Sequence, residues 1–103
     1  IDGVLGSMLL KRDGTILAVD MMLGLKEDMV SEIGRDLYLK AEQIGEETGQ
    51  RGLSFASLEA RAGRLLLAGL AEDILVILAA RDINLGQVRL ALKQGGQKKF
   101  LLA

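Results

Sequence analysis

Residues 74–80 constrain the fold more than any other part of the chain, because the segment ILVILAA is apolar at every position. Its length suits a strand and is far below the roughly 20 residues that a membrane-spanning helix needs. A strand with one face in water alternates apolar and polar side chains, and this one does not, so both of its faces should be covered. The run therefore predicts the central strand of a sheet.

Four other strand-length apolar segments occur, at residues 4–11, 15–19, 53–60 and 64–70. Asp13 and Gly14 separate the first two, and an Asp-Gly pair between apolar runs indicates a tight hairpin. The connections on either side of residues 64–70 are short as well, which favours an antiparallel meander of the last three strands. Residues 53–60 are the least hydrophobic, so we expect an edge strand or an interface.

Two helices complete the pattern. Residues 26–47 carry apolar side chains at helical spacing, and we assign this arc to the sheet; it consists of Val30, Ile33, Leu37, Ala41 and Ile44. Asn84 is a good N-cap residue for a second helix that ends near Gly95. The order of two strands, a helix, three strands and a helix predicts an α+β fold of sheet and helix layers.

A second arc of the long helix holds small residues and one ring: Gly34, Tyr38, Ala41 and Gly45. A glycine inside a helix costs about 1 kcal/mol relative to alanine, so two of them need a packing reason. We interpret this arc as a seam for the same helix of a second copy, with close packing inside one copy as the alternative. The remaining, charged arc includes Arg35 and Leu39, which are candidate partner contacts.

Composition excludes several classes of chemistry. The 103 residues suffice for one domain, and they include no His and no Cys, which removes histidine bases, thiolate nucleophiles and Cys/His metal sites. No phosphate-binding glycine motif is present. We therefore expect no catalytic residue, no cofactor and no metal, and we interpret Asp28, Glu32 and Asp36 as an exposed helix face.

Charge and hydropathy limit the partners in the same way. A net charge of −1 and three aromatic residues argue against nucleic acid and against an anionic membrane. No signal peptide or membrane span is recognisable, so we expect a cytoplasmic protein. The first residue is Ile rather than Met, which indicates a processed or truncated start.

Three segments together resemble the Roadblock family, which includes dynein light chains of the Roadblock type and the bacterial GTPase regulator MglB. They are residues 3–6 (GVLG) in the first strand, residues 12–15 (RDGT) in the hairpin and residues 82–89 (DINLGQVR) at the last helix. The resemblance implies a three-layer, profilin/longin-like fold with an antiparallel sheet in the order 2-1-5-4-3. It also implies one Roadblock-like domain over residues 1–103 that lacks the helix the family usually has before the first strand.

The resemblance further implies a homodimer. In such a dimer the third strand pairs with its copy through Leu53, Phe55 and Ser57, and the long helices pack side by side. It implies a non-enzymatic regulator or scaffold that binds a small Ras-like GTPase. A structural adaptor of the dynein-light-chain kind, with no GTPase client, is the alternative.

Overall fold

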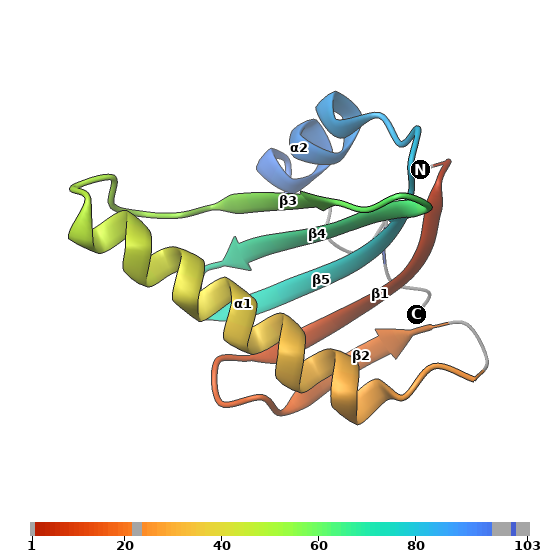
Figure 1. Ribbon diagram of the computed structural model, residues 1–103, viewed down its shortest axis with the longest axis horizontal. Helices are drawn as coiled ribbons and strands as arrows, with labels where there is room; N and C mark the ends of the chain where they lie inside the picture. The colour runs from red at the N-terminus through yellow and green to blue at the C-terminus, as the bar shows by residue number, and fades with distance from the viewer. Residues whose placement is uncertain (1, 22–23, 96–99, 101–103) are drawn as a thin grey trace.

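The computed structural model describes residues 2–21, 24–95 and 100, and Figure 1 shows its elements. The two helices and five strands follow the predicted order. Their bounds are β1 (Val4–Lys11), β2 (Ile16–Asp20), α1 (Glu27–Glu47), β3 (Phe55–Glu59), β4 (Gly63–Leu70), β5 (Asp73–Ala80) and α2 (Leu85–Lys93).

The sheet is antiparallel throughout, and its strand order is β2-β1-β5-β4-β3. This is the order that the family resemblance implies, and β5 occupies the central place that its uninterrupted apolar run predicts. The pairing puts Leu65 opposite Leu78 and Leu67 opposite Val76. Opposite residues share a face of the sheet, so the register fixes which side chains face each helix.

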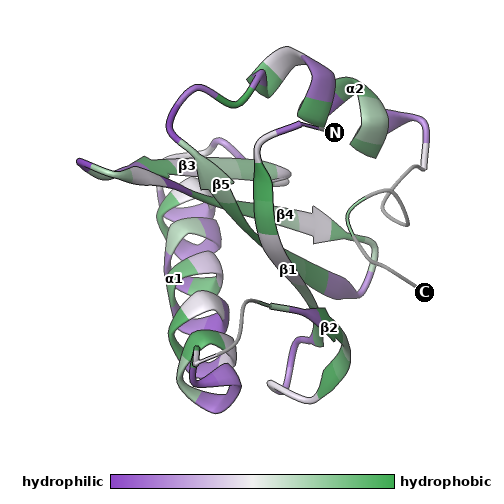
Figure 2. Ribbon diagram, turned by 90° about the vertical axis from the view of Figure 1, so that its right-hand side faces the viewer, coloured by the Kyte–Doolittle hydropathy of each residue, from purple (hydrophilic) through white to green (hydrophobic). Residues whose placement is uncertain are grey.

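The two helices cover opposite faces of the sheet, which gives three layers (Figure 2). Each face has its own core. The core on the α1 side comprises Met8, Leu10, Tyr38, Leu67, Ile74 and Val76. The core on the α2 side comprises Leu66, Ala68, Leu75, Ile77, Ala79, Ile83, Val88, Ala91 and Phe100. Because successive residues of β5 enter alternate cores, nearly all of them must be apolar.

Two local sequence signals form the predicted structures, a tight turn and a helix start. In the β1–β2 turn the Thr15 amide donates to the Asp13 carboxylate over 2.9 Å, and Gly14 takes the positive φ of 97° that the turn requires. At α2 the Asn84 side chain accepts a hydrogen bond of 3.1 Å from the Gln87 amide, as an N-cap residue does.

The rotational setting of α1 differs from the prediction. Its buried residues are Ser31, Gly34 and Tyr38, whereas Ile33 and Ile44 are 51% and 64% exposed. At 100° per residue, the predicted aliphatic arc is centred about 100° from the face that meets the sheet. The arc of small residues therefore packs on the sheet, and the aliphatic arc forms a flank of the helix.

Close approach of the α1 backbone to the sheet explains this rotational setting of the helix. A Cβ atom on Gly34 would lie 2.9 Å from Cγ2 of Val76, so the helix backbone rests on that buried valine without room for a side chain. Glycine here permits the contact that burial of the helix requires. The packing reason for Gly34 is therefore inside one copy of the chain, which was the alternative considered for this arc.

Candidate functional site

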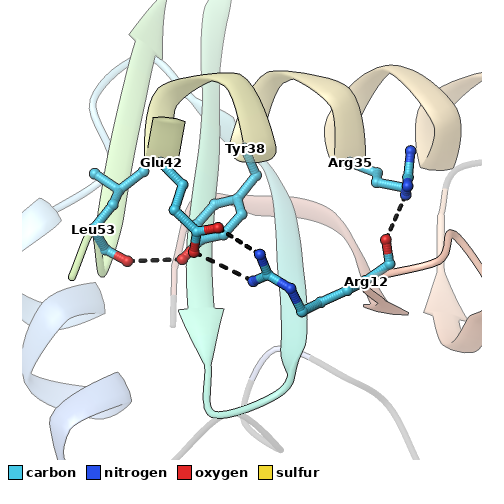
Figure 3. A network of polar contacts seen from close by, with 5 residues as sticks. All are labelled: Arg12, Arg35, Tyr38, Glu42 and Leu53. Atoms are coloured by element: carbon cyan, nitrogen blue, oxygen red, sulfur yellow. Dashed lines mark hydrogen bonds and ion pairs between the residues drawn. The ribbon is translucent and has the colours of Figure 1, made fainter. Parts of the chain in front are cut away.

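Tyr38 anchors α1 to the start of β3. Its side chain is 2% exposed, and its hydroxyl donates a 2.7 Å hydrogen bond to the carbonyl of Leu53 (Figure 3). Burial raises the pKa of the Tyr38 phenol because desolvation disfavours the phenolate. Tyr38 therefore belongs to the core of the protomer, and its predicted place on an exposed dimer seam is wrong.

A second set of contacts attaches one flank of α1 to the β1–β2 turn. The Arg12 guanidinium pairs with the Glu42 carboxylate, and Nε of Arg35 donates to the carbonyl of Arg12 (Figure 3). The hydrogen bond to Glu42 raises the pKa of Arg12. Arg35 also pairs with Asp36 at 3.1 Å. These contacts hold the flank in place and use the polar groups of Arg35 within the chain.

Leu39 lies on the same side of α1, at a position that we predicted to be exposed. It is half-buried and packs against the core on the α1 side. Both candidate partner contacts, Arg35 and Leu39, are thus engaged within the chain, and neither is a freely exposed group.

The opposite flank of α1 is apolar and partly open to solvent. Val30 and Leu37 are half-buried against the core, while Ile33 and Ile44 project beyond it. Ala41 is half-buried between this flank and the buried face. Gly45 is half-buried as well, and a Cβ there would lie 3.1 Å from the carbonyl oxygen of Gln50, so the turn after the helix restricts this position.

Part of the sheet on the α1 side adds a second apolar surface. Leu58 of β3, Leu65 of β4 and Leu78 of β5 lie opposite one another in register, and Leu65 packs against the α1-side core. Together with Leu5 they line a shallow groove of about 440 Å³. Leu5 and Leu58 are among the exposed large hydrophobic residues.

The edge strand β3 borders this surface. In the described chain β3 pairs with β4 and has no neighbour on its other side, so one row of its main-chain groups is free for another strand. Phe55 packs against the α2-side core, and Ser57, two residues later, shares its face and is exposed. Leu53 precedes the strand and packs against the α1-side core, so Leu53 and Phe55 face opposite sides of the sheet.

The structure thus divides the predicted site residues into two groups. Gly34 packs on Val76 and Tyr38 bonds to Leu53 inside the protomer, whereas Phe55 and Ser57 are on the free edge strand. The apolar flank was present in the sequence as an aliphatic arc, but its exposed members, Ile33 and Ile44, were assigned to the core. Leu58 had no distinguishing signal, because one leucine in a weakly hydrophobic strand fits either face.

Several solved structures share this architecture. A Roadblock/LC7 domain from Streptomyces avermitilis superposes with a TM-score of 0.79 at 18% identity, over 89% of this chain and 78% of that one. Myxococcus xanthus MglB superposes with a TM-score of 0.82 at 13% identity, over 94% of this chain and 80% of that one. Together with the observed strand order, these likenesses show that the fold is that of a Roadblock domain.

A closer relation exists at the level of sequence. The uncharacterized protein MJ0714 of Methanocaldococcus jannaschii is 31% identical over 97 residues, which cover 94% of this chain and 82% of that protein. The chain belongs to the same family as MJ0714. No protein-family model matches the chain. Within the described residues, neither helix is long and apolar enough to cross a membrane.

Proposed function

We propose that the protein is a homodimeric, non-catalytic regulator or scaffold that binds a small Ras-like GTPase. The observation that carries the proposal is the open apolar surface formed by the outer flank of α1 and the neighbouring sheet. It includes Ile33, Ile44 and Leu58 and is bordered by the free edge of β3. The Roadblock fold supports the same function, because the family resemblance implies a dimer and a GTPase partner.

Binding of a second copy of the chain covers both parts of this surface, the apolar flank of α1 and the free edge of β3. Pairing of β3 with the β3 strand of the second copy gives hydrogen-bond partners to the free main-chain groups of both edges. The same two-fold axis brings the apolar flanks of the two α1 helices together. Moving a half-exposed isoleucine out of water contributes about 1 kcal/mol, so four such side chains in a dimer stabilise it appreciably.

Sedimentation velocity of the wild type and two variants tests the dimer. Ile44→Glu places a charge on the flank and should weaken self-association at least about tenfold, because an unpaired charge in an interface centre is costly. Leu90→Glu is the matched control, since Leu90 is also exposed but lies on α2, on the other side of the sheet. A wild type of one-chain mass, or equal dimer mass for both variants, would refute this interface.

The GTPase partner needs a separate experiment. The dimeric protein, added to each Ras-like GTPase encoded in the same genome, should change the rate of GTP hydrolysis or of nucleotide exchange for one of them. Ile44→Glu should reduce that change if the GTPase recognises the dimer, and Leu90→Glu should preserve it. Unchanged rates for every GTPase would favour the structural adaptor instead.

A further inference from the structure

A second groove lies on the face of the sheet opposite α1 and reaches β3, the strand proposed to pair in the dimer. It has a volume of about 500 Å³ and runs between the start of β3 and α2. Phe55, Leu70 and Leu92 provide apolar walls, Ser54 adds a polar edge, and Arg89 and Lys93 of α2 line its remaining side.

The two cations of this groove are neighbours on α2, and neither forms an ion pair with a described acidic residue. Arg89 and Lys93 are four residues apart on α2, a spacing at which like charges repel. Every ion pair within 4.0 Å in the described part of the chain involves other cations, namely Arg12, Arg35, Arg51 and Arg64. The groove therefore presents two positive charges whose repulsion an anionic ligand would relieve.

Phe55 holds the Arg89 side chain in position. The guanidinium carbon lies 5.0 Å from the centre of the Phe55 ring, which is the distance of a cation–π contact. A guanidinium that packs on an aromatic ring keeps N–H groups available to pair with a carboxylate. The ring thus orients Arg89 before any ligand binds.

The apolar walls and the shape define the rest of the ligand. Leu70 and Leu92 are half-buried beside the two cations, so a ligand with an aliphatic group next to its negative charge fits better than a simple anion. A concave groove does not match a flat membrane surface. A base of a nucleic acid would need a free aromatic face, and Arg89 already covers the Phe55 ring.

We propose that this groove binds an acidic segment of a partner protein. Carboxylates of the segment pair with Arg89 and Lys93, and a neighbouring aliphatic side chain packs between Leu70 and Leu92. An extended segment that lies on the face of the sheet beside α2 suits the site best, because it leaves the main-chain edge of β3 to the second copy of the chain.

A fluorescein-labelled peptide rich in glutamate with two central leucines tests the proposal by fluorescence anisotropy with the full chain. Arg89→Gln should weaken binding about tenfold, the usual consequence of losing a charged hydrogen-bond donor, and Lys93→Gln should weaken it by a smaller factor. Lys40→Gln, which removes an exposed cation from α1, is the matched control and should bind like the wild type. The same peptide with glutamine in place of glutamate should bind far more weakly.

Each contrary result has a defined meaning. Equal binding by Arg89→Gln, by Lys93→Gln and by the wild type, absence of binding to the wild type, or equal binding of the glutamine peptide would overturn the proposal. Displacement of the peptide by an equal concentration of inorganic phosphate would show a simple anion site and overturn it as well.

Discussion

The hydroxyl of Tyr38, on α1, occupies the space that a Cβ atom on Gly69 of β4 would need. The ring passes over the sheet where the glycine leaves a gap, and its oxygen reaches the carbonyl of Leu53 beyond. One side chain thereby joins three segments that are far apart in the sequence. Gly69 and Tyr38 depend on each other, because either the ring or a side chain at position 69 can fill that space.

Gly69→Ala should therefore lower the free energy of unfolding by about 2 kcal/mol, the usual cost of overfilling a packed core. Tyr38→Phe removes the oxygen atom that collides with the new methyl group, so the alanine substitution should cost less in the Tyr38→Phe background. Urea denaturation of the four proteins of this double-mutant cycle measures the coupling. Purely additive effects would show that the ring does not depend on the glycine.

Much of the fold could be predicted because it follows from local patterns. The uninterrupted run of residues 74–80 placed β5 at the sheet centre, and the Asp13-Gly14 pair and Asn84 marked a turn and a helix start. The setting of α1 could not be predicted in this way. Two arcs of the helix were possible, and the choice depends on the fit of Gly34 over Val76 and of Tyr38 over Gly69, which are contacts between distant segments.

The candidate site was missed for the same reason. Ile33 and Ile44 have the spacing of core residues, and their exposure follows only when the small-residue arc takes the sheet. Leu53 and Phe55 have the spacing of one strand face, yet the strand begins at Phe55 and Leu53 lies in the irregular segment before it. The positive φ of 75° at Gly52 is part of that irregular segment.

The two arcs of α1 should respond differently to substitution. Gly34→Leu forces a side chain into the space of Val76 and should destabilise the protomer by about 3 kcal/mol or unfold it. Ile44→Glu should leave the helix content of the protein unchanged, because the residue is exposed in the protomer. Far-UV circular dichroism with urea denaturation separates the two results. A folded Gly34→Leu protein of wild-type stability would contradict the packing of Gly34 on Val76 and would favour the original prediction that Gly34 lies in the dimer seam.

Tyr38 should make the protein sensitive to alkali. The phenol is protonated in both the folded and the unfolded chain below its ordinary pKa of about 10, so this group does not make stability depend on pH there. Because burial raises the folded pKa, the unfolded chain loses its proton first as the pH rises, and stability falls from the unfolded pKa up to the folded pKa. The chain has one Tyr and no Trp, so phenolate absorbance reports this group directly.

The Tyr38→Phe protein is the control for that measurement. It should be less stable at neutral pH by about 1 kcal/mol, because the hydrogen bond to Leu53 is lost. Its further loss of stability above pH 10 should be smaller than that of the wild type, because the buried phenol is absent. Absorbance that titrates at the pKa of free tyrosine in the folded protein would contradict a buried phenol.

The ion pair between Arg12 and Glu42 should add little to global stability but should order the β1–β2 turn. Both side chains are partly exposed, and pairs of this kind contribute at most about 1 kcal/mol, less at high salt. Glu42→Gln should therefore cost under about 1 kcal/mol in urea denaturation at low salt and less at high salt. Glu32→Gln, at an exposed position of the same helix, is the matched control and should cost less than Glu42→Gln.

The amide of Gly14, which donates to the Lys11 carbonyl over 3.0 Å, should exchange with solvent faster in Glu42→Gln than in Glu32→Gln. A cost that does not change with salt, or equal exchange at Gly14 in both variants, would mean that the turn is held by the Arg35 contact to the Arg12 carbonyl alone.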